Sequence, residues 1–282
     1  VSCPMHRTRI FIMTLLAMLA FAGNSLLCRL ALKTTSIDAA SFTGIRLLSG
    51  ALILLLITGI GRKKISGGGD WLSAFALFCY AAGFSFAYLR LSAATGALLL
   101  FVAVQASMIG YGIYRGERLR KWQVCGLALA LSGLIVLLLP GLSAPPMSSA
   151  WMMMLAGIAW GIYSLRGKSA TDAITVTTGN FFRAIPFAIL LWGSFFAEVS
   201  LDKAGIIYAI GSGALASGLG YAIWYTALPA LKTSTAASVQ LSVPAIAALG
   251  GILLLDEHAS LRLLFASIAI LAGIALVVLR KN

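Results

Sequence analysis

Apolar stretches long enough to cross a membrane follow one another along the whole chain, separated by short polar segments. A helix needs roughly 20 residues to span the hydrocarbon core of a bilayer. The stretches are continuously apolar rather than alternating, which favours helices over the strands of an outer-membrane barrel. The predicted helices cover residues 10–30, 38–60, 71–89, 94–114, 122–140, 150–166, 174–196, 204–226, 233–255 and 261–280. The pattern therefore predicts an all-α integral membrane protein with ten transmembrane helices.

The second half of the chain is weakly similar to the first half. The paired positions include Thr95 with Thr235, Gly110 with Gly250, Glu117 with Glu257, Arg29 with Arg166, and Arg46 with Arg183. Each half holds an odd number of predicted spans, so the second copy enters the membrane in the opposite sense. Inverted repeats of this kind are typical of secondary transporters. We expect a first five-helix repeat over residues 1–140, a linker over 141–149, and a second, inverted five-helix repeat over 150–282, arranged around a central cavity.

Composition excludes a water-soluble protein. Hydrophobic residues make up 60% of the 282 residues, charged residues only 10%, and the mean hydropathy is +0.98. A soluble domain carries about a quarter of its residues as charged side chains. The net charge of +13 would point to nucleic acid in a soluble protein. Here the charges lie at the ends of the spans, where they indicate membrane topology, and we expect no nucleic-acid partner.

Basic residues gather in alternate loops. The richer side holds Arg7, Arg9, Arg62, Lys63, Lys64, Arg115, Arg118, Arg120, Lys121, Arg166, Lys168, Lys232, Arg280 and Lys281. The poorer side holds Arg29, Lys33, Arg90, Lys203 and Arg262. The positive-inside rule then places both termini in the cytoplasm. The first apolar stretch follows basic residues as in a signal peptide, but it reaches spanning length without a small-residue cleavage site, so we expect it to be a membrane helix.

Acidic residues are absent from the middle of every predicted span. Proton-coupled carriers usually titrate an intramembrane carboxylate, so this absence favours facilitated diffusion or exchange. The chain also lacks HExxH, Walker and clustered-histidine patterns. We therefore expect no catalytic residue, no bound metal and no cofactor, and the chain is predicted not to be an enzyme.

Polar and aromatic side chains inside the spans are the candidate substrate-binding residues. They are Asn24, Arg46, Tyr80, Gln105, Trp160, Tyr163, Arg183, Tyr221 and Gln240. A charged side chain in a span is costly unless it reaches an interface, a partner or a water-filled cavity. The two arginines either extend to the interface or face the interior, where they suit a carboxylate or a phosphate. The aromatic side chains lie at a membrane interface or line a cavity that stacks on a planar substrate.

Small residues are dense between Gly211 and Gly220, where the chain reads GSGALASGLG. Two interpretations are open for this stretch. Small side chains let helix backbones approach closely in lipid. The same stretch could also bend while a transporter opens and closes.

Two segments resemble the second half of an EamA repeat. The first runs from Tyr88 through Gly116-Glu117-Arg118 to Gly133, and its copy runs from Ala227 through Asp256-Glu257 to Gly273. EamA repeats define the drug/metabolite transporter superfamily, and within it the chain is most similar to YddG-type exporters of aromatic amino acids. The resemblance implies a ten-helix basket whose first, third, fourth, sixth, eighth and ninth helices line a central cavity. It favours the amides and aromatic residues above as cavity residues over the two arginines.

The expected function is export of small amphipathic metabolites, above all aromatic or other apolar amino acids, by alternating access. Two other readings are open. One is a transporter of phosphorylated or nucleotide-linked metabolites that uses Arg46 and Arg183 on the anion. The other is a non-selective channel or a scaffold. The expected partners are the small-molecule substrate and the lipid bilayer, with the chain acting as a monomer.

Overall fold

The computed structural model describes residues 7–60, 68–116, 120–139, 144–167, 172–231, 239–258 and 260–279, and every regular element within these ranges is helical. The α-helices are α1 (Arg7–Thr34), α2 (Ala39–Ile60), α3 (Trp71–Tyr88), α4 (Ala93–Tyr114), α5 (Lys121–Leu138), α6 (Met147–Gly167), α7 (Ala173–Ser194), α8 (Lys203–Ile210), α9 (Gly220–Ala227), α11 (Ser242–Leu255) and α12 (Leu261–Leu279). The other segments are the 3₁₀ turns η1 (Phe196–Glu198) and η3 (Leu228–Ala230) and the π-helix η2 (Gly211–Leu219). Outside the described ranges lie Glu117, Thr235 and the basic residues at 62–64, 118, 168, 232, 280 and 281.

Eight of the ten predicted spans coincide with a helix to within a few residues. The span predicted at 204–226 is divided among α8, η2 and α9. In the span predicted at 233–255, α11 begins only at Ser242, and residues 232–238 lie outside the described ranges. Seven helical segments of the described chain are long and apolar enough to cross a membrane, and α8, η2, α9 and η3 form one of them, Lys203–Ala230. The described apolar segments Ser242–Leu255 and Leu261–Val277 are shorter, and α6 is not among the seven. Helix α6 begins at Met147 rather than at the predicted position 150, because Pro146 lacks an N–H group and suits the start of a helix.

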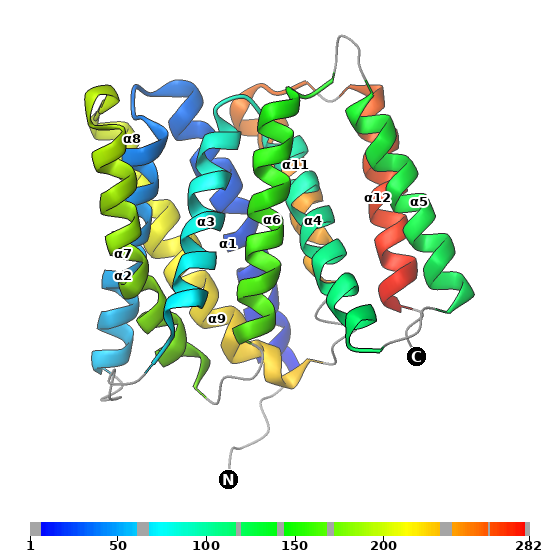
Figure 1. The fold of residues 1–282 in the computed structure, drawn as a ribbon, viewed down its shortest axis with the longest axis horizontal. Coiled ribbons are helices and arrows are strands. Elements are labelled where there is room, and N and C mark those ends of the chain that lie inside the picture. The colour runs from blue at the N-terminus through cyan, green and yellow to red at the C-terminus, as the bar shows by residue number, and fades with distance from the viewer. Residues whose placement is uncertain are drawn as a thin grey trace.

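The helices stand side by side and run between two ends of the bundle (Figure 1). Helix α5 ends and helix α6 begins at the upper edge, which we call the linker end. Helix α1 begins and helix α12 ends at the lower edge, which we call the opposite end. Successive helices therefore alternate in direction through the bundle.

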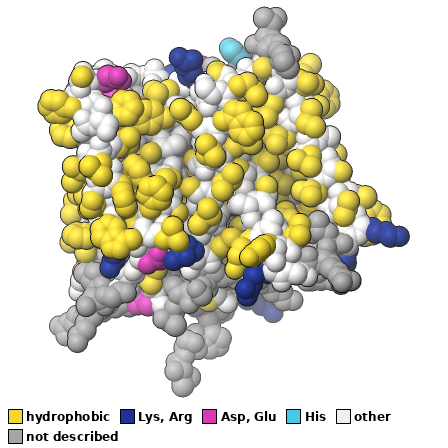
Figure 2. Space-filling model, in the orientation of Figure 1, with side chains coloured by type: hydrophobic (Ala, Val, Ile, Leu, Met, Phe, Trp, Pro, Cys, Tyr) yellow, Lys and Arg dark blue, Asp and Glu magenta, His cyan; other side chains and the backbone are white. Residues whose placement is uncertain are grey.

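The outer surface of the bundle is apolar. Large hydrophobic side chains on nearly all helices are exposed, among them Phe11, Leu56, Leu190, Leu253 and Phe265. Figure 2 shows hydrophobic side chains over the middle of one face, with Lys and Arg near its upper and lower edges. A soluble protein rarely exposes an apolar area of this extent, and this distribution is what a hydrocarbon layer requires.

Helices α5 and α12 pack on each other at the side of the bundle (Figure 1). Their backbones meet at Gly126 and Gly273, where a Cβ atom on either residue would lie 2.6 Å or less from the carbonyl oxygen of the other. Such close approach through small residues is how helices associate in lipid. The remaining helices surround the buried polar and aromatic side chains. Among them, α3 contacts α6 and α7, and α1 contacts α9 and α11.

The stretch that reads GSGALASGLG forms the π-helix η2 between α8 and α9. Residues five apart lie about 140° apart around an α-helix, whereas the wider π-helix, with its i→i+5 hydrogen bonds, brings them onto one face. Two such pairs occur here: Ser212 with Ser217, and Gly213 with Gly218. The serines hydrogen-bond to buried polar residues of α1 and α2, and the glycines pack against α2.

The contact between η2 and α2 gives a direct test of this packing. A methyl group on Gly213 would overlap the carbonyl oxygen of Arg46 and the hydroxyl of Ser49. Overpacking of this kind costs about 1–3 kcal/mol. We expect Gly213→Ala to lower the melting temperature of the detergent-solubilised protein. Gly193→Ala is the control, because a Cβ atom there meets nothing within 4 Å. Equal melting temperatures for the two variants would contradict the packing described here.

Candidate functional site

A small cavity lies in the middle of the helix bundle. The side chains that line it are Phe21, Asn24, Ser25, Tyr80, Phe84, Leu100, Phe101, Trp160 and Tyr221. They come from α1, α3, α4, α6 and α9. The cavity volume of about 20 Å³ accommodates about one water molecule, so an amino acid does not fit in this conformation. The structure is therefore a closed one, and ligand binding requires the lining side chains to move apart.

Aromatic rings form most of the cavity wall. Trp160 packs against Tyr80 and Tyr221 with ring centroids 4.8 and 4.9 Å apart. Phe21 lies edge-on to Trp160 and to Tyr221, at 6.4 and 5.8 Å. Tilted and edge-to-face pairs at such distances are favourable beyond their buried area. The wall is thus suited to an apolar, planar ligand group.

A buried arginine stands directly behind this wall. Arg46 of α2 is 1% exposed. Its Nη2 donates to the hydroxyl oxygen of Tyr80 at 3.0 Å and its Nε to Ser217 Oγ at 3.2 Å. The guanidinium carbon lies 5.0 Å from the ring centroid of Tyr80 and 4.9 Å from that of Phe84. Each cation–π contact of this kind is worth about 2 kcal/mol when it is desolvated. Arg46 thereby joins α2 to α3 and to η2.

Asn24 of α1 extends the same polar network. Its Nδ2 donates to the Tyr80 hydroxyl at 3.1 Å, and its Oδ1 accepts a hydrogen bond from Ser212 Oγ at 2.6 Å. A buried amide needs such partners, because an unsatisfied polar group in an apolar interior is costly. The amide therefore fixes α1 against α3 and η2 at the level of the cavity.

The structure brings part of the predicted site together. Asn24, Tyr80, Trp160 and Tyr221 line the cavity, and Arg46 is one hydrogen bond behind it. Tyr163 is buried and stacks on Trp160, with centroids 5.5 Å apart.

Five of the nine predicted residues do not line the cavity: Arg46 and Tyr163, described above, and three others. Gln105 is buried in α4, one turn beyond Phe101, and Gln240 is half-buried just before α11. Arg183 directs its Nη1 to the carbonyl oxygens of Gly68 and Gly179, at 2.5 and 3.1 Å, close to the opposite end. The two arginines that pair in sequence therefore occupy different surroundings.

Several cavity residues were not expected from the sequence. They are Phe21, Ser25, Phe84, Leu100 and Phe101. Their spacing along the helices was the available signal. Phe21 lies three residues before Asn24, Ser25 lies one residue after it, and Phe84 lies one turn after Tyr80. No group of three His, Cys, Asp or Glu residues suited to a metal ion occurs within the described part of the chain.

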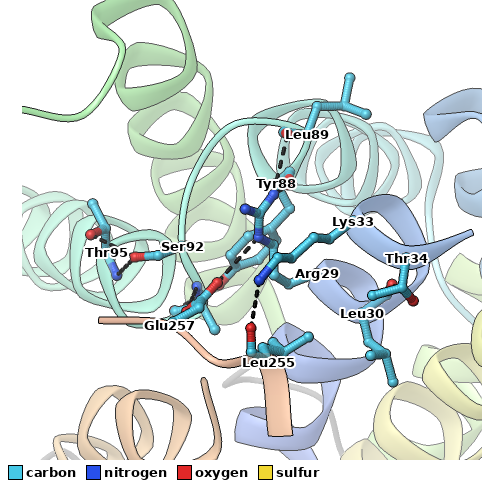
Figure 3. A network of polar contacts seen from close by, with 11 residues as sticks. Arg29, Leu30, Lys33, Thr34, Tyr88, Leu89, Ser92, Thr95, Leu255 and Glu257 are labelled. Atoms are coloured by element: carbon cyan, nitrogen blue, oxygen red, sulfur yellow. Dashed lines mark hydrogen bonds and ion pairs between the residues drawn. The ribbon is translucent and has the colours of Figure 1, made fainter. Parts of the chain in front are cut away.

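An ion-pair network closes the linker end (Figure 3). Arg29 of α1 donates from Nε to Glu257 Oε1 at 3.2 Å, and from Nη1 to the carbonyl oxygens of Tyr88 and Leu89. The second oxygen of Glu257 accepts a hydrogen bond from the backbone N–H of Ala93 at 2.8 Å. This N–H belongs to the first turn of α4, where the helix dipole favours an anion. The network holds together α1, the corner between α3 and α4, and the segment after α11.

A second ion pair lies near the opposite end. Arg166 of α6 donates from Nη2 to Asp70 Oδ1 at 3.0 Å and from Nε to Ser73 Oγ at 2.9 Å. Asp70 also caps α3, because its carboxylate accepts the backbone N–H of Ser73. The backbone N–H of Asp70 in turn donates to Asn180 Oδ1 of α7 at 2.9 Å. The start of α3 is thereby held against α6 and α7.

Apolar helices around a closed central cavity, with ion pairs at both ends, are typical of membrane transport proteins. The sequence pattern of the EamA-like transporter family matches the chain twice, over residues 8–139 and 147–279. The chain belongs to the EamA-like transporter family and is an integral membrane transporter. The resemblance to this family noted from the sequence is confirmed, whereas the narrower similarity to YddG-type exporters stays a prediction.

Relatives of known sequence support the same family. A Pseudomonas aeruginosa protein described as uncharacterized is 56% identical over 95% of this chain and 94% of its own length. An Escherichia coli relative named "probable amino-acid metabolite efflux pump" is 27% identical over 56% of this chain and 58% of its own length. A "probable terminal-alkyne amino-acid exporter" of Streptantibioticus cattleyicolor is 26% identical over 55% of this chain and 54% of its own.

One solved protein structure superposes on this fold with a TM-score of 0.67. The superposition covers 98% of this chain and 100% of that chain, at 16% identity. At this identity the likeness concerns the fold alone.

The ion pair at the opposite end predicts a pH dependence of stability. Partial burial raises the pKa of Asp70, but hydrogen bonds from Ser73 and the charge of Arg166 outweigh it and hold the pKa below its ordinary value. Ionised Asp70 therefore stabilises the folded state at pH values above the ordinary aspartate pKa of about 4. This stabilisation is lost as the pH falls through the lower pKa that Asp70 has in the folded state. The effect is small, because the Arg166 and Asp70 side chains are 41% and 45% exposed.

We expect the melting temperature of the wild-type protein to fall more than that of Asp70→Asn between about pH 6 and about pH 3. Asparagine keeps the helix cap and removes only the charge. Asp256→Asn is the matched control, because Asp256 is exposed and has a left-handed φ of 51° that asparagine also adopts. Parallel pH profiles for the wild type and Asp70→Asn would refute a role for the charge.

Proposed function

We propose that this transporter exports small amphipathic metabolites, above all amino acids with aromatic or other apolar side chains, across the bacterial inner membrane by alternating access. The observation that carries the proposal is the closed cavity, whose wall combines stacked aromatic rings with a buried polar network. Aromatic rings bind an apolar side chain, and the network offers hydrogen bonds to the carboxylate that all amino acids share. The printed names of two relatives, an amino-acid exporter and an amino-acid metabolite efflux pump, agree with this substrate class.

We infer that the two halves are inverted five-helix repeats over residues 1–140 and 150–282. Two matches to one family pattern support this division. Exchanging α1 with α6, α2 with α7, α3 with the α8–α9 span, α4 with α11, and α5 with α12 also reproduces the larger helix contacts. The α3–α6 contact becomes α9–α1, the α4–α6 contact becomes α11–α1, and the α2–α7, α4–α11 and α5–α12 contacts map onto themselves. Such a relation makes two opposite-facing conformations nearly equal in energy.

Repeat-related arginines support alternation between two closed ends. Arg29 pairs with Glu257 at the linker end, and Arg166 pairs with Asp70 at the opposite end. Opening one end requires one of these ion pairs to break while the other remains. The positive-inside rule, applied to the basic loops, supports a cytoplasmic position for the opposite end. The transporter would then load substrate beside Arg166 and release it beside Arg29, and a monomer contains all of these parts.

Transport by facilitated diffusion or exchange fits the distribution of acidic residues. The described Asp and Glu side chains lie at helix ends or in the segments between helices. A phosphorylated substrate fits less well, because the alternative requires Arg46 and Arg183 on one anion. In this structure Arg46 stands beside the cavity, whereas Arg183 bonds to Gly68 and Gly179.

Counterflow in proteoliposomes tests the proposal. The vesicles are loaded with unlabelled phenylalanine, tryptophan, threonine or a sugar phosphate, and entry of the labelled compound is followed without an ion gradient. We expect transient accumulation that is saturable and largest for the aromatic amino acids. Accumulation of the sugar phosphate alone would favour the phosphorylated substrates, and uptake without saturation or counterflow would indicate a channel. No accumulation until a pH gradient is imposed would refute the uncoupled mechanism.

A further inference from the structure

Two polar groups in the central cluster have no hydrogen-bond partner. Arg46 uses Nε and Nη2, but its Nη1 is buried and makes no hydrogen bond within the described residues. The buried Tyr221 hydroxyl also makes no hydrogen bond of good geometry, although it lies close enough to Tyr80 to interact with it. Buried polar groups in folded proteins are nearly always paired, so each exception needs an explanation. Two such groups in one cluster indicate that the cluster is completed by something that the protein itself does not supply.

The hydroxyl of Tyr80 is limited to the same kind of interaction. Its oxygen accepts hydrogen bonds from Asn24 Nδ2 and from Arg46 Nη2, which leaves only the hydroxyl proton to offer. Tyr80 and Tyr221 both line the cavity. Arg46 Nη1 and the Tyr80 hydroxyl proton can only donate, and the Tyr221 hydroxyl can donate as well as accept. A group that completes the cluster must therefore be able to accept hydrogen bonds.

The charge of the cluster points the same way. Arg46 forms no ion pair with any carboxylate that the structure describes, and no Asp or Glu is among the cavity-lining residues. A buried cation without a counter-charge is costly inside a membrane protein, and an anion beside it relieves that cost. A ligand with a net negative charge is therefore favoured over one with a net positive charge.

The number of donors indicates which anion fits. One cation and two tyrosine hydroxyls match a carboxylate, which carries a single charge and two oxygens. A phosphate ester carries up to two charges and three acceptor oxygens, and it normally requires several cations. The other lining residues are mostly aromatic or aliphatic, so the rest of the ligand is apolar.

We propose that the hydroxyls of Tyr80 and Tyr221, with the charge of Arg46 behind them, form a carboxylate subsite. The substrate class is then aromatic and apolar carboxylates, and the ammonium group of an amino acid is dispensable because no lining carboxylate receives it. The claim that such carboxylates are transported rests on the proposed function. The recognition chemistry itself is testable by binding.

Three compounds with the same phenyl ring and two-carbon chain separate the contributions of the charged groups. They are 3-phenylpropionate, L-phenylalanine and phenethylamine, and their dissociation constants are measured by calorimetry on the purified full-length protein in detergent. We expect 3-phenylpropionate to bind at least as tightly as phenylalanine. Phenethylamine should bind about tenfold more weakly or worse, because it lacks the charge-assisted hydrogen bonds. Equal or tighter binding of phenethylamine, or no binding of 3-phenylpropionate, overturns the proposal.

Variants assign the effect to named residues. Arg46→Gln should weaken 3-phenylpropionate binding by about tenfold or more, and Tyr221→Phe by a smaller factor. Neither variant should weaken the binding of phenethylamine, and loss of the Arg46 charge should strengthen it if it changes it at all. Arg9→Gln is the matched control, because it makes the same substitution at an exposed position where α1 begins. Tyr221→Phe removes a single oxygen and keeps the test available if Arg46→Gln does not fold. Wild-type affinity for 3-phenylpropionate in a folded Tyr221→Phe variant contradicts the subsite.

Counterflow of phenylalanine with the same preparations distinguishes this inference from the proposed function. Tight binding of 3-phenylpropionate that depends on Arg46, without any phenylalanine counterflow, leaves the subsite intact and refutes amino-acid transport. Phenylalanine counterflow with no preference for the carboxylate ligand supports transport and overturns the subsite.

Discussion

The desolvated charge of Arg46 is the constraint on which the centre of this protein depends. A cation at this depth costs several kcal/mol relative to water unless the surroundings compensate it. Two hydrogen bonds and two aromatic faces provide part of that compensation, and they recruit Tyr80 and Phe84 from α3 and Ser217 from η2. Because the same groups hold three helical segments together, the polar cluster is at once the centre of the fold and the candidate site. Its incomplete hydrogen bonding is the reason to propose a ligand site there rather than a structural centre only.

The closed state follows from contacts at three levels. Aromatic rings fill the centre, and an arginine–carboxylate pair ties the helices at each end. A substrate of amino-acid size needs far more room than the observed cavity, so the aromatic rings must separate when it binds. The π-helix η2 lies where α2 meets this cluster. Its serines bond to Asn24 and Arg46 and its glycines pack closely on α2, so η2 couples the eighth predicted span to this cluster.

Much of the fold could be predicted from hydropathy alone. Each long apolar stretch that the structure describes is helical, because backbone groups in lipid must bond within their own segment. The tyrosines, tryptophan and amide of the cavity were recognised because polar and aromatic groups within spans need a reason to be there. Phe21 and Phe84 were not recognised, since a phenylalanine that faces lipid and one that faces a cavity look alike in sequence.

Other features depended on tertiary contacts. Arg46 and Arg183 lie at similar depth in paired helices, yet one meets Tyr80 and the other meets a backbone carbonyl at the bundle end. Hydropathy does not register this difference. Hydropathy also did not predict the π-helix, although the five-residue spacing of its serines and glycines was a usable signal. The ion pair between Arg29 and Glu257 joins residues from opposite halves of the chain, so only the folded arrangement reveals it.

The central claim is that a closed cavity opens to one end at a time. Pairs of spin labels placed beside the Arg29–Glu257 and Arg166–Asp70 contacts report the separation at the linker end and at the opposite end. Pulsed electron-spin distance measurements are made in proteoliposomes, with and without phenylalanine. The account predicts that a population with a longer distance at one end keeps the short distance at the other. Simultaneous lengthening at both ends, or no change at either end, would contradict it.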